Sequence, residues 1–215
     1  MSYLTLCEAV KQCRACPLGA QGLGVPGEFI GPNPQPEIMA ILEAPGGIEQ
    51  EVGRPVWGES GQLFRTLMDE CGVKSYYVTN VAKHRPLVLK GKQQRPDAVA
   101  IKACGGFLDA EITMVRPSRL ILCGNVAASR ILGVPGNTAQ SALVNRVFEA
   151  ELPYGKAPTL VLYHTAYFLH NRTSVWVNKQ INDWKRALRN FLGADIPHYN
   201  IEEVRCADPR HVSAF

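Results

Sequence analysis

The chain has 215 residues, of which 46% are hydrophobic and 20% are charged, and its formal net charge at pH 7 is +4. This length suffices for one well-buried domain, which we expect to span residues 1–193, followed by an irregular tail over residues 194–215. No apolar run approaches the roughly 18 to 20 residues of a membrane-spanning helix, and the first residues lack a signal-peptide pattern, so we expect a cytoplasmic protein. The pI of about 8.7 is compatible with a partner that has a phosphate backbone but does not indicate a strongly basic surface.

Four apolar runs have the length and composition of buried β-strands. They lie at residues 37–42, 76–81, 119–123 and 159–164. Helical patterns separate these runs, and a polar stretch covers residues 135–146. The helical features that we predict are an N-cap at Ser60, a stop at Gly72, Pro96 in a first turn, a short helix ending near Gly133 and a last helix over residues 174–192. This alternation predicts an α/β fold, a three-layer sandwich with a central parallel sheet covered by helices on both faces.

Three loops follow the predicted strands at one edge of that sheet. They cover residues 43–47, 80–84 and 164–172. In open α/β sheets, ligands bind in the crevice beyond the carboxyl ends of the strands. We therefore expect the functional site to be formed by these loops.

The seven cysteines suggest a second kind of site. Cys13 and Cys16 are separated by two residues, and Cys104 lies in a predicted helix about ninety residues further on. Two close thiolates and a distant one indicate a metal or iron-sulfur site that ties the N-terminal segment to the domain. We expect the other four to be structural: Cys7, Cys71, Cys123 and Cys206.

Several short motifs follow one another along the chain: Glu43-Ala44-Pro45-Gly46, Gly53-Arg54-Pro55-Val56-Trp57-Gly58, Gly61-Gln62-Leu63, Thr79-Asn80-Val81-Ala82-Lys83, Arg85-Pro86 and His164-Thr165-Ala166-Tyr167-Phe168-Leu169. In this order they resemble the motifs of the iron-sulfur family-4 uracil-DNA glycosylases, with this chain as a divergent member. The resemblance covers residues 4–193. It implies an enzyme that flips uracil, or a related modified base, out of DNA and hydrolyses its N-glycosidic bond to start base excision repair. It also implies a 4Fe-4S cluster that supports the structure.

Two residues fit the chemistry of that reaction. The Asn80 amide can donate to uracil O4 and accept from N3–H, which excludes cytosine. His164 can stabilise the negative charge that develops on the uracil ring as the bond breaks, which resembles the histidine of the family.

Further residues are expected around the base. Main-chain amides near Ala44, Gly46 and Gly47 could add donors, because glycine permits close approach. Glu43 is expected to orient water or the sugar. Phe168 and Leu169 are the predicted wedge that replaces the flipped base in the DNA stack.

The chain departs from the family pattern at several positions. His84 stands where the family has a third cluster cysteine, so we expect Cys3His ligation by Cys13, Cys16, His84 and Cys104, with a zinc site as the weaker alternative. The aromatic residue that stacks on uracil is replaced by Val56, so that either the adjacent Trp57 reaches the base or stacking is weakened. Three further replacements are Leu42 for Gly, Thr165 for Pro and His170 for Arg.

These departures leave two further functions open. One is a non-hydrolytic or covalently trapping binder of uracil-containing or single-stranded DNA, and the other is a metal-binding nucleic-acid adaptor without a base pocket. A monomer is expected in each case. A short basic stretch predicts electrostatic DNA binding through Lys83, Arg85, Lys90, Lys92 and Arg95.

Overall fold

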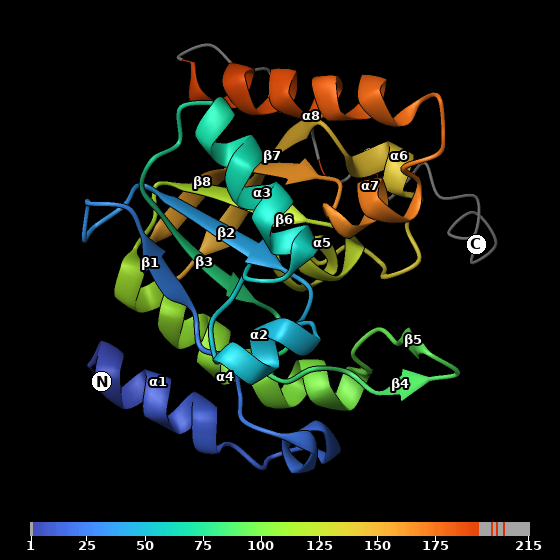
Figure 1. The fold of residues 1–215 in the computed structure, drawn as a ribbon. Helices are drawn as coiled ribbons and strands as arrows, with labels where there is room; N and C mark the ends of the chain where they lie inside the picture. The colour runs from blue at the N-terminus through green and yellow to red at the C-terminus, as the bar shows by residue number, and fades with distance from the viewer. Residues whose placement is uncertain (1, 194–198, 200, 202–203, 205–215) are drawn as a thin grey trace, which may run out of the picture.

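A six-stranded mixed sheet forms the centre of the molecule in a computed structural model that describes residues 2–193, 199, 201 and 204 (Figure 1). The strand order is β1-β3-β2-β6-β8-β7. The bounds are β1 Glu28–Ile30, β2 Ile38–Leu42, β3 Tyr76–Asn80, β6 Arg119–Cys123, β7 Arg146–Leu152 and β8 Gly155–Leu162. The four inner strands are parallel, and the edge strands β1 and β7 are antiparallel to their neighbours. The predicted α/β fold is confirmed, with antiparallel edges added.

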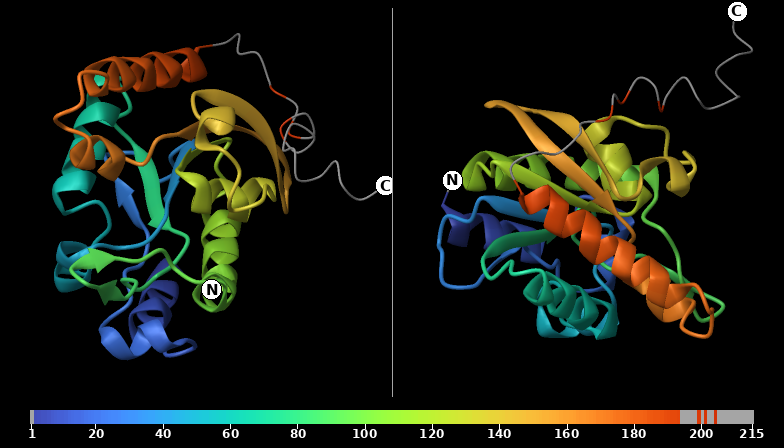
Figure 2. Two further views of the ribbon diagram at one scale, coloured as in Figure 1. Left: turned by 90° about the vertical axis from the view of Figure 1, so that its right-hand side faces the viewer. Right: turned by 90° about the horizontal axis from the view of Figure 1, so that it is seen from above.

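Helices cover both faces of the sheet (Figure 2). One face packs against α3 Glu59–Glu70 and α8 Val177–Leu192, and the other against α4 Ala98–Val115 and α5 Asn125–Leu132. The strands serve both layers because successive side chains point to opposite faces, so that Ala40 joins one core and Met39 and Ile41 the other. The remaining elements are α1 Tyr3–Gln12, η1 Pro17–Gln21, α2 Gly47–Val52, α6 Gln140–Leu143, α7 Ala166–His170 and the hairpin of β4 Val88–Leu89 and β5 Lys92–Gln93.

The ends of the predicted helices need small corrections. The N-cap of α3 is Gly58, and Ser60 lies inside the helix, whereas the stop at Gly72 is confirmed by its left-handed φ of +85°. The N-cap of α4 is Asp97, whose side chain accepts the Ala100 amide hydrogen, so Pro96 precedes the cap. The last helix begins at Val177 rather than at residue 174.

The polar stretch predicted over residues 135–146 leads into a β-hairpin. It contains α6 and ends in β7, which pairs with β8 from Arg146 opposite Val161 to Leu152 opposite Gly155. Most of the predicted tail, residues 194–215, lies outside the described residues, so the domain boundary stays a prediction. Tyr199 is described, and its amide donates to the Val147 carbonyl at 2.7 Å. Among the helices that the structure describes, none has the length and apolar character to cross a membrane.

Candidate active site

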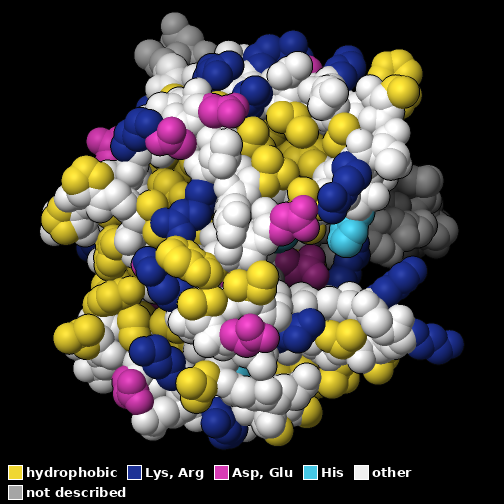
Figure 3. Space-filling view, viewed as in Figure 1, with side chains coloured by type: hydrophobic (Ala, Val, Ile, Leu, Met, Phe, Trp, Pro, Cys, Tyr) yellow, Lys and Arg dark blue, Asp and Glu magenta, His cyan; other side chains and the backbone are white. Residues whose placement is uncertain are grey.

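A cavity of about 410 Å³ opens where the parallel strands end. The register places Leu42 at the end of β2 beside Asn80 at the end of β3, and both residues line the cavity. His164, two residues after β8, lines it as well. The space-filling view shows a hollow on this face with histidine and acidic side chains at its rim (Figure 3). The predicted location of the site at the strand ends agrees with this cavity.

His164 is held as a neutral imidazole. Its Nδ1 accepts the main-chain amide hydrogen of Ala166 at 3.2 Å, which leaves the ring proton on Nε2. Burial lowers the pKa of His164 to about 4, although the charge of Glu49 acts in the opposite direction. At neutral pH the ring therefore has one N–H donor to offer to a ligand in the cavity.

The loop after β2 lines the cavity through its main chain and small side chains. Ala44, Gly46 and Gly47 are all lining residues, as predicted for them. Glu43 is not among the lining residues. It is half-buried beside them, its carbonyl accepts the Ala82 amide hydrogen at 3.0 Å, and burial raises the pKa of its carboxyl group, with Arg95 opposing.

Glu49 is a functional candidate that sequence reasoning missed. It lies in α2, is buried and lines the cavity. Its carboxylate accepts main-chain hydrogens from Gly46 at 3.1 Å, Trp57 at 3.0 Å and Gly58 at 2.7 Å. One side chain thus joins the loop after β2 to the loop before α3, two walls of the same cavity.

Val56, and not Trp57, faces the cavity. Val56 is buried with a left-handed φ of 53°, and α3 approaches it so closely that a side chain at Gly61 would lie 2.3 Å from Val56 Cα. Trp57 is absent from the lining residues. Its ring forms cation–π contacts with two guanidinium groups, with Arg54 Cζ at 4.4 Å and Arg65 Cζ at 5.1 Å from the ring centre. The prediction that Trp57 contacts the base is therefore not supported by its position.

The two residues of the predicted wedge lie in different environments. Phe168 is 2% exposed and packs edge-on against the rings of Tyr163 and Tyr167 in one of the two cores. A side chain in that position cannot enter a DNA stack, so the prediction for Phe168 is wrong in this conformation. Leu169 is half-buried and lines the cavity. It remains the wedge candidate.

The predicted cluster ligands come from three segments: Cys13 and Cys16 from the turn between α1 and η1, His84 from the loop after β3, and Cys104 from α4. Cys16, His84 and Cys104 are buried, and Cys13 is half-buried. Both ring nitrogens of His84 are buried without a hydrogen-bond partner, which is costly unless they bind a group that the protein itself does not supply. Burial raises the pKa of the Cys104 thiol, and the nearby Cys13 and Cys16 raise it further. This donor set fits an iron-sulfur cluster.

The geometry for a single ion is a separate question. A structural zinc site needs four ligands around one ion, whereas a 4Fe-4S cluster binds one ligand at each of four irons. Among the described residues, no group of three or more His, Cys, Asp or Glu side chains is arranged to hold one ion. Cys3His ligation of a cluster, with zinc as the weaker alternative, stays a prediction.

The basic stretch is only partly at the surface. Lys83 is 0% exposed and pairs with Glu111, so its predicted contact with DNA is wrong. Lys90, Lys92 and Arg95 are exposed on or beside the hairpin β4–β5, which turns at Lys90 and Gly91. Gln93 of this hairpin lines the cavity and donates to the Pro45 carbonyl at 3.2 Å. The hairpin thus extends a basic surface from the mouth of the cavity.

The family model and the relatives that this chain matches are all described as uracil-DNA glycosylases. Residues 30–191 match the family model described as the uracil DNA glycosylase superfamily. A type-4 uracil-DNA glycosylase of Sulfurisphaera tokodaii is 31% identical over 170 residues, which cover 76% of this chain and 74% of that protein. The type-4 enzyme of Archaeoglobus fulgidus is 30% identical, with 75% and 80% covered, and that of Pyrobaculum aerophilum is 29% identical, with 79% and 85% covered.

Proposed function

Because this chain belongs to the uracil DNA glycosylase superfamily, and within it to the type-4 uracil-DNA glycosylases, we infer that it excises uracil from DNA. The reaction hydrolyses the N-glycosidic bond and starts base excision repair. The observation that carries this inference in the structure is that the neutral His164 and Asn80 both line one cavity at the strand ends. An enzyme that acts on a base in this way must first flip the base out of the stack into a pocket.

We propose that Asn80 reads the edge of the flipped base. Its amide is able to donate to O4 and to accept from N3–H of uracil, whereas cytosine offers the opposite pattern at these two positions. Ala44, Gly46 and Gly47 provide a wall of small residues along the base, and Val56 provides an aliphatic contact in place of aromatic stacking. Leu169 at the cavity is proposed to fill the space that the base leaves in the DNA.

His164 is proposed to stabilise the departing base. Negative charge develops on uracil as the glycosidic bond breaks, and the Nε2–H of a neutral imidazole donates to it. The Ala166 amide already orients the ring, so little reorganisation is needed during the reaction. We assign the orientation of water or sugar to Glu43, because Glu49 uses its carboxylate on three main-chain amides.

The ligands that we propose for a 4Fe-4S cluster are Cys13, Cys16, His84 and Cys104. When bound, the cluster would supply structural cross-linking between the N-terminal segment and α4, and no chemical step is assigned to it. Anaerobically purified protein should contain iron and labile sulfide, and Cys104→Ala should lose both and melt at a lower temperature. Stoichiometric zinc without sulfide would contradict this ligand assignment.

We further propose that the protein acts as a monomer in the cytoplasm, on DNA. The six cysteines that the structure describes form no disulfide, as expected in a reducing compartment. Exposed Lys90, Lys92 and Arg95 are proposed to contact phosphates, so DNA affinity should fall steeply with added salt.

The deciding experiment is single-turnover release of uracil from a labelled oligonucleotide. Wild-type protein should release free uracil, and His164→Ala should reduce the rate by about 100- to 1,000-fold, the usual effect of losing one transition-state donor. The affinity of that variant for DNA should stay close to that of the wild type. Tight binding by the wild type without release of the base would contradict the hydrolase, and a DNA adduct that survives denaturation would indicate covalent trapping instead.

A further inference from the structure

A buried ion pair lies close to the cavity and has no part in the mechanism above. Lys83 and Glu111 are both 0% exposed, and Lys83 Nζ lies 2.6 Å from Glu111 Oε2. Lys83 belongs to the loop after β3 and Glu111 to α4. Moving two charges out of water is costly, so such a pair requires partners for its remaining donors and acceptors.

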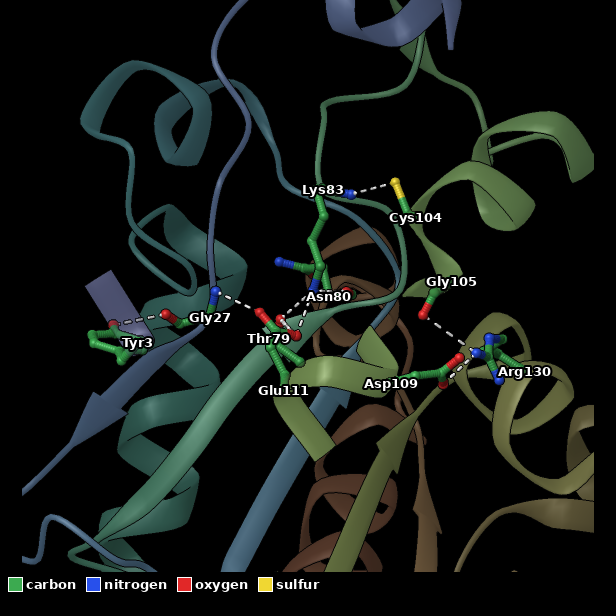
Figure 4. Close-up of polar contacts among 10 residues, drawn as sticks. All are labelled: Tyr3, Gly27, Thr79, Asn80, Lys83, Cys104, Gly105, Asp109, Glu111 and Arg130. Atoms are coloured by element: carbon green, nitrogen blue, oxygen red, sulfur yellow. Dashed lines mark hydrogen bonds and ion pairs between the residues drawn. The ribbon is translucent and has the colours of Figure 1, made fainter. Parts of the chain in front are cut away.

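The network around this pair is complete (Figure 4). Besides Glu111, the Lys83 ammonium donates to Thr79 Oγ1 at 2.6 Å and to the main-chain oxygen of Asn80 at 2.8 Å, so each of its three hydrogens has an acceptor. The Glu111 carboxylate also accepts from the Thr79 hydroxyl at 2.8 Å and from the Gly27 amide at 3.1 Å. The end of β3 is therefore attached to α4 by charged hydrogen bonds.

The main chain of Lys83 is held as firmly as its side chain. Its amide donates to Cys104 Sγ at 3.3 Å, and its carbonyl accepts the Val25 amide hydrogen at 2.7 Å. Lys83 is thus fixed by three separate segments of the chain. Because its side chain reaches back to the Asn80 carbonyl, the position of Asn80 depends on this attachment.

We propose that Lys83 is a positioning residue for base recognition: it holds the Asn80 main chain, so that the Asn80 side chain stands where its amide reaches the edge of uracil. The proposal rests on the proposed function, which assigns base reading to Asn80. The physical reason is that the amide favours uracil only while it reaches O4 and N3–H together, and a main-chain shift of about 1 Å lengthens both hydrogen bonds. Uracil loses these bonds on such a shift, whereas cytosine, which does not form them, loses little.

The test replaces the whole pair, because removal of one partner leaves a buried charge and unfolding could follow. Lys83→Met with Glu111→Leu is introduced into His164→Ala protein, which prevents loss of the base during the measurement. Equilibrium binding is measured for two single-stranded oligonucleotides that differ only in one uracil or one cytosine. We expect the uracil-over-cytosine affinity ratio to fall about tenfold, which corresponds to about 1.4 kcal/mol. Affinity for the cytosine oligonucleotide should change less than about twofold.

A double-mutant cycle separates positioning from a general structural effect. In an Asn80→Ala background the same pair replacement should leave the uracil-over-cytosine affinity ratio unchanged, because there is no side-chain amide left to position. The matched control is the ion pair of Arg130 and Asp109, which also involves α4 but does not contact Asn80. Arg130→Met with Asp109→Leu should leave the ratio unchanged. If the first double replacement does not fold, Thr79→Val removes one acceptor of Lys83 and should lower the ratio about threefold.

The outcomes distinguish this proposal from the proposed function. An unchanged ratio after pair replacement, or an equal loss in the Asn80→Ala background, would overturn the role of Lys83 while wild-type uracil release continued. A wild-type protein that released no uracil would instead contradict the proposed function. His164→Ala protein that bound both oligonucleotides equally would overturn the proposal, because Asn80 would have no selectivity to support.

Discussion

The two halves of the cavity are supported in different ways. Asn80 lies above a buried ion pair, and its main chain accepts a hydrogen bond from a charged donor. His164 is held by neutral groups: the Ala166 amide bonds its ring, and the neighbouring Thr165 hydroxyl donates to the Ser60 carbonyl at 2.7 Å. The half around Asn80, which is proposed to read the base, is therefore attached to the core by charged hydrogen bonds. The half around His164, which is proposed to assist bond cleavage, is attached to α3 by a hydroxyl group.

This difference has a physical consequence for mutation. A charge left without its partner in the core is far more costly than an unpaired hydroxyl or carbonyl near the edge of a cavity. We therefore expect changes beneath Asn80 to act mainly on folding stability when one partner is removed. Changes of the neutral groups around His164 should cost less stability, because no charge is left without a partner.

The largest expected effect is that of Lys83→Met alone. The buried Glu111 carboxylate would lose its cation, and we expect the free energy of unfolding to fall by about 3–5 kcal/mol. Urea denaturation at pH 7 measures this change. The added substitution Glu111→Leu should restore most of the lost stability. A loss below about 1 kcal/mol for Lys83→Met would contradict the view that charged hydrogen bonds support the Asn80 half more strongly than neutral groups support the His164 half.

The next effect concerns the pH dependence that His164 produces. Its pKa is about 4 in the folded protein and about 6.5 in an unfolded chain, so the unfolded state takes up the proton first as pH falls. Its contribution to stability is thus present above about pH 6.5 and is lost as pH falls toward 4, by at most about 3 kcal/mol. Urea midpoints of wild type and His164→Gln between pH 4 and 7 measure it. Parallel pH profiles for the two proteins would argue against a lowered pKa.

The smallest expected effect is that of Thr165→Val. Valine keeps the shape of threonine but cannot donate to the Ser60 carbonyl, so we expect a stability loss of about 1–2 kcal/mol. The rate of uracil release should fall only a few-fold, because the Ala166 amide still orients the His164 ring. Chemical denaturation and single-turnover kinetics on the same preparation test both. A loss as large as that of Lys83→Met would show that the two halves are equally sensitive.

The inner strands were predictable because they are buried on both faces and read as continuous apolar runs. β7 was missed although buried Phe148 and Ala150 alternate with exposed Glu149 and Glu151, which is the pattern of a half-buried edge strand. The prediction of strands relied on continuous apolar runs, and β7 has none. The N-cap of α3 was assigned to Ser60 on residue preference alone. In the structure the cap is Gly58, and the Ser60 hydroxyl lies 2.9 Å from that of Thr165.

The site was predictable where a residue directly follows a strand. Asn80 and His164 line one cavity because parallel strands end at one edge of the sheet. Trp57 and Phe168 could not be placed, because one residue along a turn or short helix changes which side chain faces the cavity. Glu49 was missed because its role depends on amides of three residues that come together only in the folded chain.

Val56 combines a strained left-handed backbone with a side chain that lines the cavity. A β-branched residue in this conformation is strained by about 1–3 kcal/mol, and glycine or asparagine would adopt it with less strain. The conformational preference of the backbone thus does not account for valine at this position. Its side chain must contribute enough burial and contact to offset the strain, and its stiff χ1 torsion gives the cavity a wall that adapts little to the shape of a ligand.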